Sequence, residues 1–158
     1  PEVIDERKRY YSESADYQML AGDVRDGNWL ESIPEKKRAI VAMEGVSMYL
    51  TSKEFHELIT SLCAHFEQIA LLMDCYTEMA AKASKYKNPI NDVGVTQVYG
   101  LDVPEELNNI DGVTFVKEHN MTPDYLIEQL QGMERKIFEK LYAGKVAQKM
   151  YRLYEYKK

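Results

Sequence analysis

The stretch RAIVAMEGVSMYLTSKEFHELITSLC, residues 38–63, decides the fold. It opens with a nearly continuous apolar run at residues 38–43, which is typical of a strand covered on both faces. Thr51 and Glu54 follow as a capping-box pattern at the start of a helix. The apolar side chains of that helix recur at helical spacing: Phe55, Leu58, Ile59, Leu62, Cys63 and Phe66. A strand, a turn and an amphipathic helix in this order predict a crossover unit of an α/β sheet.

Further strand-length runs and helical patterns extend from this unit in both directions. We predict strands at residues 17–21 (YQMLA), 68–73 (QIALLM), 113–117 and 150–156 (MYRLYEY). We predict helices at residues 1–12, 29–33, 77–86 and 125–148, the last broken at Gly132 or Gly144, and a polar loop at residues 87–100. The alternation of strands and helices indicates one α/β sheet.

Composition excludes several classes of protein. With 158 residues, 45% of them hydrophobic, and a formal net charge of -6, the chain fits one acidic domain with a real core. The sequence pI of about 5.2 offers no basic face to neutralise phosphates, so we expect no nucleic-acid partner. The apolar runs at residues 39–43 and 69–73 fall far short of the ~20 residues of a membrane helix, so we expect no membrane partner. Cys63 and Cys75 form no disulfide or metal-ligand pattern, which favours reduced thiols, no metal and a cytoplasmic location.

Three acids follow the first three predicted strands. Asp23 comes after residues 17–21, Glu44 after residues 38–43 and Asp74 after residues 68–73. Ligands of open α/β sheets bind beyond the carboxyl ends of the strands, so we expect the three carboxylates at one edge of the sheet. Each acid also has a structural interpretation, which we favour for any one of them alone. Asp23 fits a turn acceptor, Glu44 a helix or loop cap, and Asp74 a cap of the next helix.

Other catalytic chemistries find little support in the residues. The three histidines, His56, His65 and His119, are scattered and have no partner at metal-ligand spacing. Cys63 belongs to the apolar stripe of its helix, which indicates a buried, inert thiol. The sequence contains no GxSxG, no HExxH and no glycine loop for phosphates, so hydrolysis and phosphoryl transfer have no recognisable machinery.

Two segments carry a resemblance that composition alone does not supply. Residues 21–26 (AGDVRD), with Trp29 after them, match a D-L-R-D segment, and residues 43–50 (MEGVSMYL) match an E-G-[VL]-x-M-Y-L segment. Both segments, at about this separation, resemble the leucine carboxyl methyltransferase family, including its bacterial branch similar to the tetracenomycin polyketide O-methyltransferases. The resemblance covers essentially the whole chain, although from Asn88 onward it rests on the pattern of elements.

The resemblance implies roles for particular residues in binding S-adenosylmethionine. Asp23 would accept a hydrogen bond from the adenine amino group, while the N–H of Val24 meets a ring nitrogen. Glu44, with Gly45 beside it, would face the methionine part of the cofactor, where a carboxylate suits an ammonium group. Tyr49 would support the motif or lie on the acceptor side. We expect Arg25 and Trp29 to pack and orient the adenine loop.

The resemblance also implies a fold and a reaction. The fold is a Rossmann-like methyltransferase sheet, mostly parallel, with an antiparallel strand at residues 150–156. The reaction is O-methylation, on a carboxylate or hydroxyl oxygen of a small, polyketide-like molecule, with a protein C-terminus as the weaker candidate. The family has a first strand, a glycine turn and a ribose-binding acid before the part that matches Pro1. We therefore expect residues 1–158 to be the later portion of one domain, inactive alone, that self-associates or pairs with a preceding segment.

Two alternatives stay open from the residues. A non-catalytic α/β interaction module that has lost its cofactor site would account for the missing glycine turn. A fragment of a dinucleotide-dependent oxidoreductase would also have this type of sheet, but the pairs Asp23-Val24 and Glu44-Gly45 argue against it.

Overall fold

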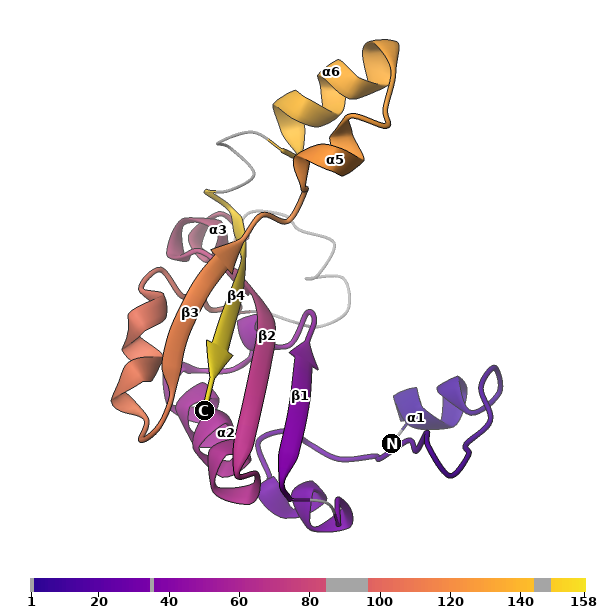
Figure 1. Ribbon diagram of the computed structural model, residues 1–158, viewed down its shortest axis with the longest axis vertical. Coiled ribbons are helices and arrows are strands. Elements are labelled where there is room, and N and C mark those ends of the chain that lie inside the picture. The colour runs from indigo at the N-terminus through magenta and orange to yellow at the C-terminus, as the bar shows by residue number, and fades with distance from the viewer. Residues whose placement is uncertain (1, 35, 85–96, 144–148) are drawn as a thin grey trace.

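The computed structural model describes residues 2–34, 36–84, 97–143 and 149–158, which form a mixed sheet with helices (Figure 1). The strands are β1 (Arg38–Met43), β2 (Gln68–Tyr76), β3 (Thr114–His119) and β4 (Tyr151–Lys157). Their order across the sheet is β1-β2-β4-β3. β1 and β2 are parallel, and β4 runs antiparallel to both β2 and β3. The predicted α/β class and the predicted antiparallel terminal strand are therefore confirmed.

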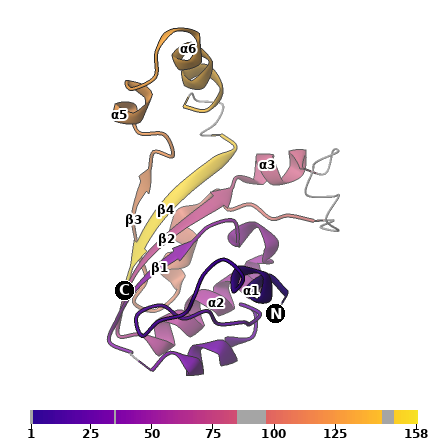
Figure 2. The ribbon, with the colours of Figure 1, turned by 90° about the vertical axis from the view of Figure 1, so that its right-hand side faces the viewer.

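The described helices are α1 (Glu2–Arg7), η1 (Gly27–Ser32), η2 (Ser47–Tyr49), α2 (Ser52–His65), α3 (Glu78–Ala83), η3 (Pro104–Asn109), α5 (Asp124–Ile127) and α6 (Gly132–Leu141). Helix α2 covers one side of the sheet, whereas α1, α5 and α6 lie away from its faces (Figures 1 and 2). Helix α2 forms the crossover from β1 to β2, as the sequence predicts (Figure 2). Its capping box is present: the Glu54 N–H donates to Thr51 Oγ1 at 3.2 Å, and the Thr51 N–H donates to Glu54 Oε2 at 2.8 Å. No described helix is both long enough and apolar enough to cross a membrane.

The main core lies between α2 and the sheet. All six apolar side chains predicted on the buried face of this helix are buried. They pack against alternate residues of β2 and against the tyrosines of the last strand, Tyr154 and Tyr156, which are 0% and 1% exposed. Each fully buried aliphatic side chain stabilises the fold by roughly 1.5–3 kcal/mol. This core fixes the direction in which β1 and β2 end, and so places the residues that follow them.

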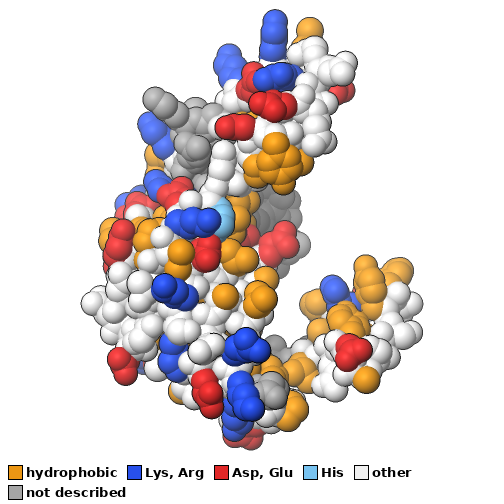
Figure 3. All heavy atoms as spheres, viewed as in Figure 1, with side chains coloured by type: hydrophobic (Ala, Val, Ile, Leu, Met, Phe, Trp, Pro, Cys, Tyr) orange, Lys and Arg blue, Asp and Glu red, His pale blue; other side chains and the backbone are white. Residues whose placement is uncertain are grey.

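The other face of β1 is open, which corrects the prediction of a strand covered on both faces. Ile40 is 83% exposed, and the strand alternates exposed and half-buried residues. In Figures 1 and 2, α2 lies behind the sheet, and no described helix covers the front of β1. Hydrophobic side chains gather over this face (Figure 3). An apolar run thus indicates a strand correctly, but it does not show which of its faces are packed.

The predicted strand at residues 17–21 is wrong. The only ladder contact described there is an isolated antiparallel bridge between Ser14 and Tyr17. The N–H of Met19 donates instead to the Glu13 carboxylate at 2.8 Å. A strand exists only where a neighbour accepts and donates its backbone hydrogen bonds, and none of the described strands lies beside these residues. Asp23 consequently does not follow a strand in this structure.

Further differences concern the ends of elements. β2 continues past the predicted residues 68–73 to Tyr76, so Asp74 lies within the strand. The helix predicted at residues 125–148 is divided into α5 and α6, and the second begins at Gly132, whose φ is +60°. The helix predicted at residues 77–86 ends at Ala83. Gly144 and most of the loop predicted at residues 87–100 lie outside the described residues.

Candidate functional site

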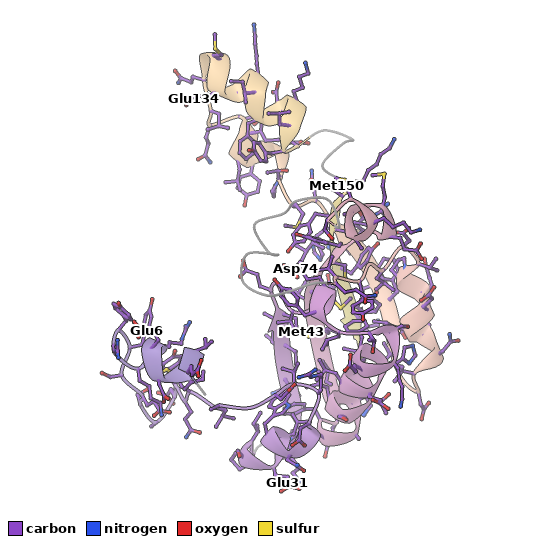
Figure 4. The ribbon with its side chains drawn as sticks, turned by 180° about the vertical axis from the view of Figure 1, so that it is seen from behind. Glu6, Glu31, Met43, Asp74, Glu134 and Met150 are labelled. Carbon is purple, nitrogen blue, oxygen red and sulfur yellow. The ribbon has the colours of Figure 1, made fainter. Side chains whose placement is uncertain are left out.

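The turn that follows β1 is held against β2. The chain leaves β1 at Met43, and Gly45 adopts φ +66°, a left-handed conformation that glycine takes with little strain. The N–H of Gly45 donates to both carboxylate oxygens of Asp74, each at 2.9 Å. Figure 4 shows Met43 and Asp74 near the same end of these neighbouring strands. The prediction that the segment with Glu44 and the segment with Asp74 lie together at the carboxyl end of the sheet is therefore correct.

Asp74 is the centre of this arrangement. Its residue is 4% exposed, and its carboxylate also accepts a hydrogen bond from the Tyr151 hydroxyl of β4. The Ser47 hydroxyl donates to the main-chain carbonyl of Asp74 at 2.5 Å. The expectation that Asp74 caps the next helix is wrong, because Thr77 caps α3 by accepting from the Ala80 N–H at 3.1 Å. Asp74 instead joins the end of β1 to β2 and β4.

Tyrosines and a second carboxylate surround this buried acid. Burial, followed by the hydrogen bond to Asp74 and the charge of Glu44, raises the pKa of Tyr151 above its usual range. The rings of Tyr76 and Tyr151 meet edge to face with centroids 5.4 Å apart. Tyr49 lies in η2 and is 44% exposed. The end of the sheet thus combines two acids with three phenol rings.

The charge of this cluster favours a cationic ligand. Glu44 is exposed, and neither Glu44 nor Asp74 forms an ion pair with a lysine or arginine of the described residues. A carboxylate without a cationic neighbour attracts an ammonium or sulfonium group, and aromatic rings add cation–π attraction. The donor set at the end of β1 therefore fits the positively charged methionine part of S-adenosylmethionine.

Asp23 forms a local turn with Arg25. The Asp23 carboxylate accepts from the main-chain N–H of Arg25 at 3.0 Å and from its guanidinium Nη2 at 2.5 Å. The hydrogen bonds from Arg25 lower the pKa of Asp23 to about 2. The carbonyl of Asp23 also accepts from the Asp26 N–H at 3.0 Å. The turn-acceptor interpretation of Asp23 describes this geometry, and the predicted adenine contact stays a prediction.

The Asp23 turn lies beside the start of α2. Arg25 Nη1 is 3.9 Å from Glu54 Oε1, and Glu54 in turn caps the helix through Thr51. Val24 packs against the main core with Trp29, whose Cβ lies 3.0 Å from the position of a Cβ built on Gly22. These contacts connect the two sequence motifs, because α2 begins directly after the segment that contains Glu44 and Tyr49. The expected packing role of Arg25 and Trp29 agrees with them.

A cavity of about 280 Å³ opens near η2 and α3. Its apolar wall includes Leu50, Phe55, Ala81, Val98 and Leu101, and its polar wall includes Ser47, Glu78, Lys82, Gln97, Tyr99 and Glu106. Residues 97–101 close one side of it, because the Tyr99 N–H donates to the Met48 carbonyl and the Leu101 N–H to the Tyr76 carbonyl, both at 2.8 Å. Sequence reasoning did not find this cavity.

The thiol in the cavity wall is buried, and His65 and His119 are each hydrogen-bonded to another part of the fold. Burial raises the pKa of Cys75 to about 12, so its thiol is protonated and unreactive at neutral pH. The Nε2 of His65 is hydrogen-bonded with the Ile33 carbonyl at 3.0 Å, and the Nε2 of His119 with the Glu155 carboxylate at 2.6 Å. These two histidines are engaged in structural contacts.

Comparison with known proteins finds two methyltransferases with related sequences. The chain is 25% identical over 136 residues to the tetracenomycin polyketide synthesis O-methyltransferase TcmP of Streptomyces glaucescens, a match that covers 85% of this chain. It is 23% identical over 137 residues to the S-adenosyl-L-methionine-dependent methyltransferase dpfgK of Gibberella zeae, over 78% of this chain. The chain is related to S-adenosylmethionine-dependent methyltransferases. The resemblance seen in residues 21–26 and 43–50 is thereby confirmed at the level of this family.

The matches cover 50% and 46% of the two relatives, so the chain spans about half the length of the curated relatives it matches. No family model matches the chain.

Proposed function

We propose that the protein containing this chain transfers a methyl group from S-adenosylmethionine to an oxygen atom of a small molecule. The observation that carries this proposal is the Glu44–Gly45 turn, held by Asp74 at the carboxyl end of β1. The names of the two relatives, an O-methyltransferase and an S-adenosylmethionine-dependent methyltransferase, support the same reaction class.

We assign the cofactor contacts to the two turns. Glu44 would bind the ammonium group of the methionine part, since its exposed carboxylate has no cationic partner among the described residues. Asp23 and the N–H of Val24 would bind the adenine. When bound, the cofactor supplies a methyl group already activated on a sulfonium. The residues of this chain then have to bind, orient and exclude water, with little need for acid–base chemistry.

We place the acceptor in the cavity between η2 and α3. Apolar side chains such as Leu50 and Phe55 suit the body of a polyketide-like molecule, and Ser47 and Tyr99 offer hydrogen bonds to its polar groups. A carboxylate acceptor is ionised at neutral pH and needs no base, whereas a phenol gains from one. Tyr49, exposed on η2, is our candidate on the acceptor side. A protein C-terminus is the weaker acceptor candidate.

The alternative is a non-catalytic interaction module, and methyl transfer distinguishes the two. Purified full-length protein should transfer labelled methyl from S-adenosylmethionine to members of a panel of aromatic carboxylic acids and phenols. Glu44→Gln should reduce turnover at least about tenfold, because a charged hydrogen bond is worth more than 1 kcal/mol. The matched control is Glu57→Gln, an exposed acid of α2 that pairs with Lys53 at 3.6 Å. Absence of both turnover and cofactor binding in the wild type would favour the interaction module.

We also propose how residues 1–158 behave alone and where the protein is located. Residues 1–158 alone should bind S-adenosylmethionine weakly and transfer no methyl group, because the contacts that we assign among their described residues are those at Asp23, Val24 and Glu44. A cytoplasmic location fits the two free cysteines, Cys63 and Cys75, which are both buried.

A further inference from the structure

We propose that Asp74 and Tyr151 are positioning residues, which hold the Glu44 turn in the geometry that binds the cofactor. The inference rests on the proposed function, because it assumes that Glu44 contacts the cofactor. It adds two residues far apart in the chain, one in β2 and one in β4, that neither sequence motif contains.

The hydrogen bonds leave the turn little freedom. Both oxygens of the Asp74 carboxylate accept from the N–H of Gly45 at 2.9 Å. This restrains the peptide plane between Glu44 and Gly45. Because β1 ends at Met43, directly before Glu44, the backbone is restrained on both sides of Glu44, which limits the directions its side chain can take. The left-handed φ of Gly45, +66°, belongs to the same conformation.

The carboxylate is itself held by a second donor. The Tyr151 hydroxyl donates to Asp74, and the Tyr151 ring packs on Tyr76 with centroids 5.4 Å apart. Because β4 is hydrogen-bonded to β2 with Tyr151 opposite Tyr76, both tyrosines are anchored in the sheet. Ser47 adds a second attachment through its hydroxyl on the Asp74 carbonyl at 2.5 Å.

An unpaired carboxylate at 4% exposure is costly unless its hydrogen bonds satisfy it. Asp74 has no lysine or arginine partner among the described residues, and its described donors are the Gly45 N–H and the Tyr151 hydroxyl. Hydrogen bonds to an ionised acceptor are about twice as strong as neutral ones, so a carboxylate at this position would hold the turn more strongly than the neutral amide of an asparagine. Asp74→Asn tests this difference.

The test compares Asp74→Asn and Tyr151→Phe with Tyr156→Phe in the full-length protein. Tyr156 is the matched control because it lies in the same strand and its hydroxyl also makes a partly buried hydrogen bond, to the Pro104 carbonyl at 2.9 Å. Three quantities are measured: the affinity for S-adenosylmethionine by calorimetry, the hydrogen-exchange rate of the Gly45 amide, and the melting temperature. Each of the two test variants is also made in a Glu44→Gln background.

Asp74→Asn and Tyr151→Phe should weaken binding about tenfold and speed exchange at Gly45. In the Glu44→Gln background the same changes should weaken binding less than about twofold, because the group they position is already altered. Tyr156→Phe should lower the melting temperature and leave both the affinity and Gly45 exchange unchanged. If Asp74→Asn fails to fold, Tyr151→Phe decides the question alone.

Two results would overturn the inference. One is unchanged Gly45 exchange in both test variants, and the other is an equal loss of affinity with and without Glu44→Gln. A wild-type protein that does not bind S-adenosylmethionine would contradict the proposed function instead, and Gly45 exchange would then still decide whether Asp74 and Tyr151 hold the turn.

Discussion

The N–H of Gly45 donates to both carboxylate oxygens of Asp74, a residue 29 positions later in the chain. This contact joins the end of β1 to β2 and converts a short loop into a defined turn beside Glu44. It also explains why a buried acid is tolerated in a mostly apolar strand, because the carboxylate is satisfied by a main-chain donor and a tyrosine hydroxyl.

Substitution of Gly45 tests the backbone conformation of the turn without introducing a steric clash. Beyond its chain neighbours, a Cβ at this position would meet no atom of the described residues within 4 Å, so Gly45→Ala adds mainly backbone strain at φ +66°. We expect a loss of about 1–2 kcal/mol in the free energy of unfolding, measured by chemical denaturation. Gly27→Ala is the control, since its Cβ would make ordinary contacts with Ser61, the nearest at 3.7 Å, without a positive φ. Equal losses in the two variants would contradict the strained turn.

Gly100 is required for a different reason, because the backbone of another segment lies too close to leave room for a side chain. A Cβ on Gly100 would lie 2.4 Å from the carbonyl carbon of Thr77 and 2.5 Å from the Glu78 nitrogen. Gly100→Ala must therefore move the segment that closes the cavity, and we expect about 1–3 kcal/mol of destabilisation in denaturant unfolding. It should also weaken binding of the methyl acceptor while leaving cofactor affinity unchanged. An unaltered stability would show that this segment is not packed against the start of α3.

The capping box of α2 should contribute measurably to stability. Thr51→Ala removes the side-chain acceptor for the Glu54 N–H and should cost about 1 kcal/mol in the free energy of unfolding. Thr60→Ala, at an exposed position inside the same helix, is the control, and it should leave stability equal or slightly higher because alanine has the better helix propensity. Destabilisation of both variants by the same amount would argue against a specific cap.

The Asp23–Arg25 pair predicts a pH effect. The hydrogen bonds that Asp23 accepts from Arg25 lower the pKa of the Asp23 carboxyl from 3.8 to about 2. A carboxyl whose folded pKa is depressed stabilises the fold above its unfolded pKa and loses that contribution as pH falls through the folded value, here between about pH 4 and 2. The effect on stability should be small because the pair is exposed. An NMR titration should give a pKa of about 2, rising toward 3.8 in Arg25→Gln; a wild-type value near 3.8 would contradict the ion pair.

Much of the fold could be predicted because individual strands and helices have recognisable local sequence patterns. The apolar run at residues 38–43 became β1, and the Thr51 capping box and the stripe after it became α2. The run at residues 17–21 looked similar but formed no strand. A strand forms only beside another strand that pairs with it, and the local sequence pattern does not show whether such a neighbour exists.

The candidate site was predicted in part for a related reason. Glu44 and Gly45 belong to a local motif, and the structure places them at the end of β1 as expected. Asp74 was expected at a strand exit, but β2 extends past it because the backbone pairs with β4 as far as Tyr76. Tyr151 was not found at all, since its partner lies 77 positions away and no local pattern marks a tyrosine for such a contact.

The central claim, that the Asp23 and Glu44 turns bind S-adenosylmethionine, is tested most directly by calorimetric titration of the full-length protein. The account predicts micromolar binding by the wild type. It predicts a loss on the order of 1–3 kcal/mol for Asp23→Ala, which removes the adenine acceptor, and a comparable loss for Glu44→Gln. Wild-type affinity in both folded variants, or no binding by the wild type, would contradict it.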